Sequence, residues 1–174
     1  MRNIKWLWLL PVLFACMLVL AKQKEEVPSL VVYESNNPAT GWNWHDGDLT
    51  ADHWFGVLEN NQQLTALLAE RPYLQERLPA EINWKEEVLV VAALGAAPTG
   101  GYAVRINQIT SSSLSMQVQL AMKSPAPSDM VIQIITYPVD SVCLQRSKLG
   151  PSDAKWHFVD TKGQLIEVYP PADS

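Results

Sequence analysis

Five side chains that could bind a metal or transfer protons lie within nine residues of each other. They are His45, Asp46, Asp48, Asp52 and His53. Imidazole and carboxylate groups are common zinc ligands, and together they form general acid–base pairs. Their spacing matches neither the helical two-histidine motif nor a calcium loop, which needs a glycine and a distant glutamate at fixed positions. We therefore expect a solvated loop with no metal or cofactor. A hydrolase that uses His45 or His53 with a nearby aspartate remains an alternative.

Three tryptophans, Trp42, Trp44 and Trp54, flank this cluster. Indole rings stack on sugars and peptides at recognition sites, but they also cover the ends of small cores. A carbohydrate-binding module is therefore a second alternative.

A glycine-rich run, Thr99-Gly100-Gly101, lies between two strand-like segments. Its backbone amides could cradle an anion. The run lacks the spacing and the lysine of a phosphate loop, however, and no helix pattern follows it. The pattern favours a tight turn in which glycine supplies backbone angles that a Cβ forbids. Such a rigid loop beside Tyr102 is typical of a recognition edge.

No local motif in the sequence places an activating base beside a nucleophilic side chain. No Gly-x-Ser-x-Gly elbow is present. Cys143 is the one thiol beyond residue 21, so it cannot form an intrachain disulfide there, and we expect it to be a small buried hydrophobe. His157 lies in a strand-like run and is expected to be packed. We therefore predict a protein that is not an enzyme.

The first 21 residues have the layout of an export signal. Arg2 and Lys5 precede an uncharged apolar run that ends at Ala21. Cleavage after Ala21 and retention as an N-terminal membrane anchor are both compatible with this pattern. Leu13-Phe14-Ala15-Cys16 also resembles a lipobox, which makes Cys16 a candidate for lipidation. All three fates place the rest of the chain outside the cytoplasm, in the periplasm or anchored in the cell envelope.

The charge of the chain excludes one class of partner. The formal net charge is −5, and it becomes −7 without residues 1–21, which hold two of the 13 basic residues and none of the 18 acidic ones. No cluster of Lys and Arg remains, so we expect no nucleic-acid binding.

The remaining pattern predicts one helix among many strands. Asn60 or Asn61 can cap a helix that Pro72 ends, with Leu64, Leu67 and Leu68 on one side. Runs of β-branched and alternating apolar residues predict strands at 30–33, 53–58, 88–94, 102–107, 114–122, 130–137, 139–144, 156–159 and 165–168.

These elements favour an α+β fold with a mostly antiparallel, sandwich-like β-sheet packed with one main helix, because the strands are consecutive. An apolar export or anchor helix would precede it. The expected organisation is a signal or anchor at 1–21, a tether at 22–28 and a single domain at 29–174.

One stretch of the chain resembles a known family. Gly95 follows an apolar strand; then come Pro98-Thr99-Gly100-Gly101-Tyr102, Ser124-Pro125-Ala126-Pro127 and Thr136-Tyr137-Pro138. This arrangement, over a core of about 85–145, resembles the C-terminal domain family of the protease complex subunit PrcB. The resemblance implies an exported, often lipid-anchored, noncatalytic accessory domain, whose founding example accompanies a surface serine protease.

The expected function is therefore that of an exported accessory or binding module. Its expected partner is another exported protein, with a protease as a candidate, and the membrane is a second partner if the N-terminus is uncleaved or lipidated. A protease inhibitor or stabiliser is a variant of the same class. The expected binding face comprises Pro98, Thr99, Gly100, Gly101, Tyr102, Ser124, Pro125, Pro127, Tyr137 and Pro138.

Overall fold

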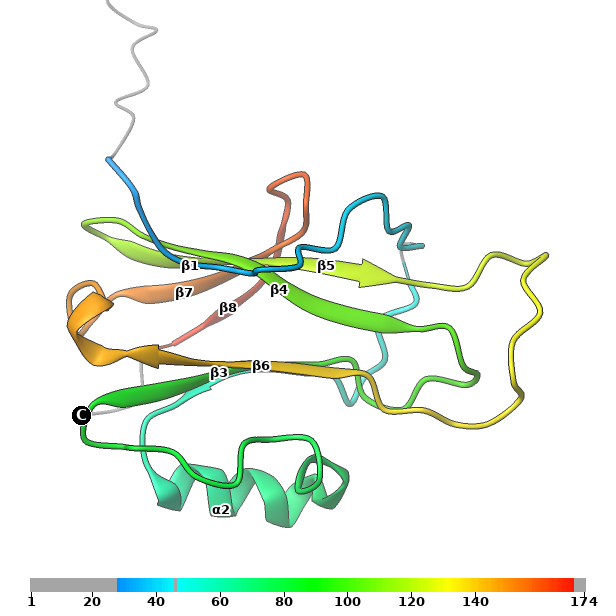
Figure 1. Ribbon diagram of the computed structural model, residues 1–174, viewed down its shortest axis with the longest axis horizontal. Helices are drawn as coiled ribbons and strands as arrows, with labels where there is room; N and C mark the ends of the chain where they lie inside the picture. Colours follow the sequence, from blue (N-terminus) through cyan, green and yellow to red (C-terminus); the bar gives the residue numbers. More distant parts are fainter. Residues whose placement is uncertain (1–27, 46, 171–174) are drawn as a thin grey trace, which may run out of the picture.

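The computed structural model describes residues 28–45 and 47–170 (Figure 1). The apolar helix expected within residues 1–21, together with Cys16 and the three fates of the N-terminus, lies outside the described residues. Within the described part, no helix has the length and apolar character needed to cross a membrane.

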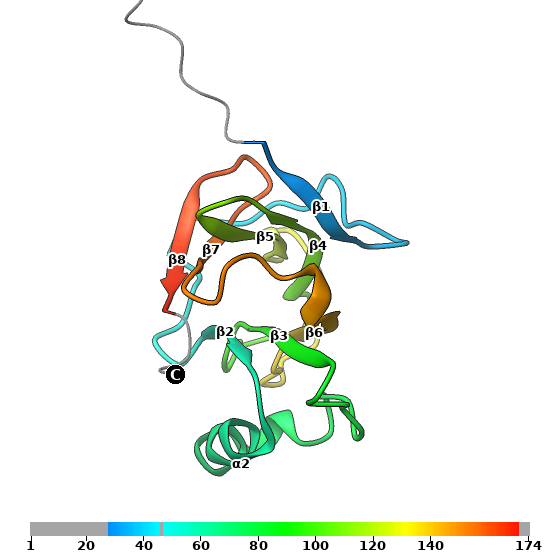
Figure 2. The ribbon, with the colours of Figure 1, turned by 90° about the vertical axis from the view of Figure 1, so that its left-hand side faces the viewer.

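The strands form two sheets that face one another (Figure 2). The five-stranded sheet has the order β1 (Leu30–Glu34), β4 (Ala103–Ser111), β5 (Ser115–Lys123), β7 (Lys155–Val159) and β8 (Leu165–Tyr169). The three-stranded sheet has the order β2 (Trp54–Leu58), β3 (Glu87–Ala93) and β6 (Val139–Gln145). All neighbours are antiparallel except the parallel pair β5–β7. The structure is thus β-rich with one α-helix among the described residues, which confirms the α+β class.

Strand β3 is buried on both of its faces. Val88, Val90 and Ala92 point into the core between the two sheets. The alternate residues Leu89, Val91 and Ala93 point the other way, into a smaller core beneath the helix. A strand covered on both faces is apolar at every position, which is why this run lacks the alternation of β5.

Helix α2 (Asn61–Glu70) covers the outer face of the three-stranded sheet (Figure 2). The Asn60 side chain accepts a hydrogen bond from the Gln63 amide at 2.9 Å, which caps the first turn as the sequence predicts. Pro72 then begins a short 3-10 helix, η2 (Pro72–Leu74), whose Leu74 is fully buried in the smaller core.

The strand predicted at 130–137 is wrong. In this segment only Thr136 forms a β-bridge, with Ala97, and the next strand begins at Val139. The segment belongs to the loop between β5 and β6, beyond the end of the three-stranded sheet (Figure 1). Its β-branched residues favour strand conformation, but a strand also requires a neighbour that supplies hydrogen bonds.

Two burial predictions are also wrong. The alternation of Val104 and Ile106 with Ala103 and Arg105 predicts that Asn107 lies on the wet face of β4, but a register shift between Ile106 and Gln108 turns it inward. Its amide group pairs with the backbone of Ala39 at 2.9 and 3.0 Å. Cys143 is exposed rather than buried, because it faces outward on the edge strand β6.

Candidate binding surface at one end of the sheets

Three loops meet at one end of the molecule, opposite the end where β1 begins (Figure 1). They are the described residues of the segment 35–53, which excludes residue 46, and the segments 94–102 and 124–138; the three segments follow β1, β3 and β5. The last two carry all of the residues predicted for the binding face.

The loops 94–102 and 124–138 are joined by backbone hydrogen bonds. Ala97 and Thr136 exchange two such bonds, at 2.8 and 2.9 Å, and the Gly100 amide donates to the Ile132 carbonyl at 2.9 Å. The Thr136 hydroxyl donates to the Thr99 carbonyl at 2.9 Å. These bonds hold the Pro-Thr-Gly-Gly-Tyr and Thr-Tyr-Pro runs side by side, although they are far apart in the sequence.

The glycines of this turn are required by its geometry. Gly101 has a φ of 92°, in the left-handed region that favours glycine. A Cβ on Gly100 would lie 2.7 Å from the Ile132 side chain. The turn interpretation is therefore supported, while the Gly100 amide already serves Ile132 and cannot also cradle an anion.

Ser124 ties the loop 124–138 to the loop that carries the tryptophans. Its side chain is buried, its amide donates to the Asn43 carbonyl at 2.8 Å, and its hydroxyl accepts from the His45 amide at 3.2 Å. The two loops enclose an open pocket of about 370 Å³, lined in part by Trp42, His45 and Lys123. The Ser124 hydroxyl oxygen accepts this bond from the backbone, and no hydrogen bond joins the hydroxyl to the His45 ring.

Aromatic side chains brace the loops against the rest of the fold. Trp44 packs edge-on to Tyr102, with ring centroids 6.4 Å apart. Tyr137 stacks on Tyr73, which follows α2, at 4.4 Å. Burial, and to a lesser extent the Asp48 carboxylate, raise the pKa of Tyr102. Tyr102 and Tyr137 are thus half-buried, and each presents one side to the surface.

The three tryptophans do not form a common stacking platform. The Trp42 ring lies under the Arg105 guanidinium at 5.9 Å, and Trp44 packs on the core between the sheets. Trp54 instead packs on the smaller core and against Tyr169. Trp42 and Trp44 line one pocket, but Trp54 lies apart from them, which does not favour a carbohydrate-binding module that uses all three rings.

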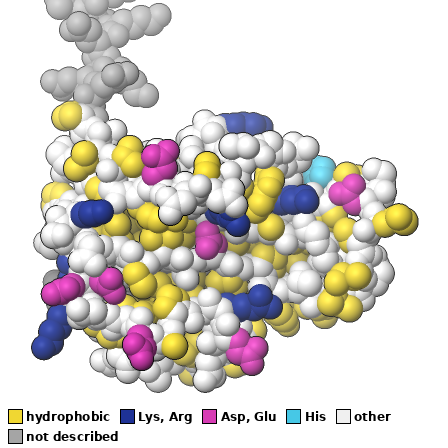
Figure 3. Space-filling model, viewed as in Figure 1, with side chains coloured by type: hydrophobic (Ala, Val, Ile, Leu, Met, Phe, Trp, Pro, Cys, Tyr) yellow, Lys and Arg dark blue, Asp and Glu magenta, His cyan; other side chains and the backbone are white. Residues whose placement is uncertain are grey.

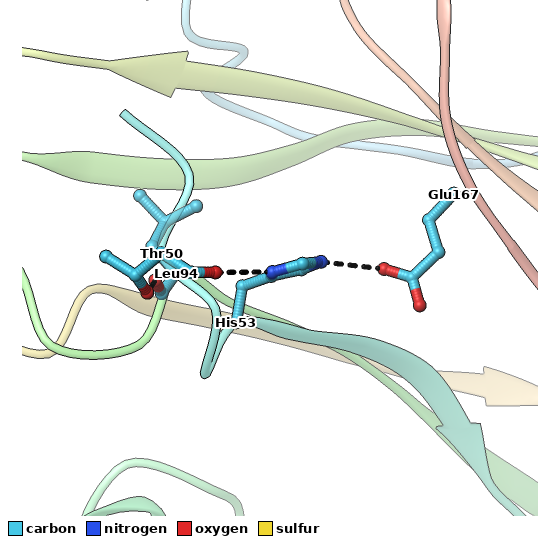
Figure 4. A network of polar contacts seen from close by, with 4 residues as sticks. All are labelled: Thr50, His53, Leu94 and Glu167. Carbon is cyan, nitrogen blue, oxygen red and sulfur yellow. Dashed lines mark hydrogen bonds and ion pairs between the residues drawn. The ribbon is translucent and has the colours of Figure 1, made fainter. Parts of the chain in front are cut away.

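The two histidines of the first loop have different neighbours. His53 contacts the Thr50 carbonyl through Nδ1 at 2.6 Å and the Glu167 carboxylate through Nε2 at 3.1 Å (Figure 4). The His45 ring lies 3.6 Å from the Asp48 carboxylate. Asp46 is outside the described residues, and no group of three or more potential ligands that could hold a metal occurs among the described ones.

The sequence pattern did not predict that the apolar residues of the segment 130–135 are exposed. Met130 is fully exposed, and Ile132, Ile134 and Ile135 are 63 %, 55 % and 64 % exposed. Hydrophobic side chains gather at this end of the molecule in Figure 3. The two prolines that flank the segment, Pro127 and Pro138, could have indicated a loop, because they separate it from the regular strands on either side.

A comparison with protein families identifies this part of the chain. Residues 88–145 match the family model described as PrcB C-terminal. Because of this match, we call residues 88–145 the PrcB C-terminal segment. The resemblance predicted from the loop motifs is thereby confirmed. Comparisons with curated proteins and with solved structures found no match.

The PrcB C-terminal segment runs from the second residue of β3 to the last residue of β6. It contributes two strands to each sheet, namely β4 and β5 to one, and β3 and β6 to the other. It also contains both hydrogen-bonded loops of the candidate surface. The strands β1, β2, β7 and β8 and the helix α2 lie outside the matched residues.

Proposed function

We propose that this chain is a noncatalytic accessory subunit of an exported protease complex. In this proposal, its partner is another exported protein that binds at the loop end. The surface comprises Pro98–Tyr102, Ser124–Pro127, Tyr137 and Pro138.

The observation that carries the proposal is the bonding between the loops of the PrcB C-terminal segment. The Ala97–Thr136 and Gly100–Ile132 hydrogen bonds fix the shape of the surface in the free protein. A preformed surface loses little conformational entropy when a partner binds. Pro98, Gly101 and Pro127 are exposed on it, and Tyr102 supplies a half-buried aromatic ring of the kind that often anchors interfaces.

The surroundings of the reactive groups support a role without catalysis. Desolvation of the thiol, and then the Glu87 carboxylate, raise the pKa of Cys143 and so disfavour the nucleophilic thiolate. The Ser124 hydroxyl and both ring nitrogens of His53 have partners within the fold. Among the described residues no hydroxyl or thiol is hydrogen-bonded to a histidine ring, so these contacts do not favour the hydrolase alternative.

Export rests on the N-terminal sequence. The basic start followed by the apolar run to Ala21 favours secretion, with either a retained anchor or a lipid on Cys16 holding the protein at the membrane. The intact mass of the exported protein distinguishes cleavage, retention and acylation.

The binding surface is tested by capture of partners from envelope extracts with the full-length chain. We expect Tyr102→Ala, and replacement of residues 124–128 by a glycine–serine loop, to reduce capture of a specific partner about tenfold, as for loss of an interface hot spot. Tyr33→Ala is the matched control, because Tyr33 is a half-buried tyrosine on β1. If all captured proteins remain with both surface variants, the proposed surface is wrong.

A further inference from the structure

His53 lies where the edges of the two sheets meet. It immediately precedes β2, an edge strand of the three-stranded sheet, and its ring contacts Glu167 on β8, an edge strand of the five-stranded sheet (Figure 4). The uncharged ring of Phe55 packs beside it, with ring centroids 5.2 Å apart. The polar contact of His53 therefore joins the two sheets at one side of their shared core.

Both ring nitrogens of His53 face oxygens that accept hydrogen bonds. Nδ1 lies 2.6 Å from the Thr50 backbone carbonyl, and Nε2 lies 3.1 Å from the Glu167 carboxylate. A carbonyl and an ionised carboxylate can only accept, whereas a neutral imidazole has a single N–H to donate. The doubly protonated ring donates to both oxygens and carries the positive charge that attracts the carboxylate. The geometry thus matches an imidazolium.

We propose that His53 and Glu167 form a pH-dependent clamp between β8 and the three-stranded sheet. While the ring holds two protons and the carboxylate is ionised, the clamp is a charge-assisted hydrogen bond. As the pH rises, Nε2 loses its proton and its lone pair then faces the carboxylate, while Nδ1 keeps its proton for Thr50. Since free histidine and glutamate titrate at about 6.5 and 4.3, we expect the clamp to be strongest between these pH values and to weaken above them.

The surroundings of the clamp leave one charged partner for the ring. Among the described residues, Glu167 is the charged group within ion-pair distance of His53. The neighbouring carboxylate of Asp52 is bonded to the Thr50 hydroxyl and the Ala96 amide instead. The side chains of His53 and Glu167 are 27 % and 36 % exposed, so protons reach them from solvent, and water partly screens the pair. No residue of the proposed binding surface takes part, so the clamp can be tested without a partner.

Nuclear magnetic resonance of the ring nitrogens tests the protonation of His53 directly. The full-length chain, kept in mild detergent because of its apolar N-terminus, is labelled on its three histidines, and His53→Gln identifies the signals. We expect Nε2 of His53 to lose its proton about half a pH unit higher in wild type than in Glu167→Gln, and the remaining proton to stay on Nδ1. Equal titration midpoints, or a neutral ring whose proton is on Nε2, would overturn the proposal.

Thermal unfolding measures what the clamp contributes to the fold. At about pH 6, the unfolding midpoint of wild type should exceed that of Glu167→Gln by about 1–4 °C. At about pH 8.5 this advantage should disappear, because the glutamine amide can donate to the unprotonated Nε2. Glu34→Gln is the matched control, because Glu34 is exposed at the end of β1 and has no ion pair among the described residues. It should show no such dependence on pH. A wild-type advantage that is the same at both pH values would contradict the clamp.

Discussion

Asp52 shows how single residues hold the loop end in place. Its carboxylate accepts hydrogen bonds from the Thr50 hydroxyl at 2.7 Å and from the Ala96 amide at 3.3 Å. The Leu94 carbonyl also lies 2.7 Å from this hydroxyl, so the two acceptors share its single proton. The loop before β2 is thereby joined to the turn that follows β3. The Thr50 hydrogen bond is the main reason why the pKa of Asp52 is lowered from 3.8.

The lowered pKa makes a prediction about stability and pH. The charged carboxylate stabilises the folded state above the ordinary aspartate pKa, and this contribution disappears as the pH falls through the lower folded value. Asp52→Asn should therefore be less stable than wild type at neutral pH, by less than about 1 kcal/mol because the group is solvent-exposed. The difference should become smaller as the pH is lowered from neutral to about 2, because the carboxyl is protonated as the pH falls through its lowered folded pKa and is then uncharged like the asparagine amide. Urea unfolding at the two pH values measures it, and an equal difference at both would contradict the prediction.

The turn after β3 also depends on its contact with the loop before β2. Gly95 has a φ of 74°, and a Cβ there would press on Thr50 and Asp52. Gly41 has a similar φ of 71°, but nothing lies within 4 Å of its Cβ position. The two glycines therefore separate the cost of backbone strain from the cost of crowding.

Gly95→Ala should destabilise the fold more than Gly41→Ala does. The backbone strain of alanine in this region costs about 1–3 kcal/mol at either site. At Gly95 the side chains of Thr50 and Asp52 must also move, which breaks the hydrogen bonds that join two loops. Denaturant midpoints of the two variants measure the difference, and equal losses of stability would show that the crowding is relieved without cost.

The whole molecule depends on the core between the two sheets. Phe55 of β2 and Phe158 of β7 are almost completely buried, and their rings stack with centroids 5.6 Å apart. The His53–Glu167 contact lies beside them and also joins the two sheets, since Glu167 is on β8 (Figure 4). The PrcB C-terminal segment holds neither phenylalanine. It therefore needs the flanking strands to complete its core.

Phe158→Ala should destabilise both sheets together, by about 3–5 kcal/mol. Circular dichroism and amide exchange in β3 and β5 should follow a single transition, because the two sheets share one core. Val168→Ala on β8 is the control; Val168 is 41 % exposed, so its loss should change stability by less than about 0.5 kcal/mol. Separate transitions for the two sheets would contradict a shared core.

The family and most elements followed from the sequence, because their causes are local. The Asn60 cap and Pro72 delimit α2, the unbroken apolar run of β3 implies cover on both faces, and the alternation in β5 implies one wet face. The Pro-Thr-Gly-Gly-Tyr run was recognisable for the same reason, since its glycines are demanded by the turn itself.

Tertiary structure alone decided which segments meet. Residues 130–137 have the composition of a strand, but the loops beside them leave most of the segment without a neighbour. The bulge that buries Asn107 depends on Ala39, which lies 68 residues away. The hydrogen bond between Ser124 and His45 joins two loops, and the sequence of neither loop predicts this contact. Pairing across such distances depends on the arrangement of the whole chain, and for this reason it is not encoded in any local pattern.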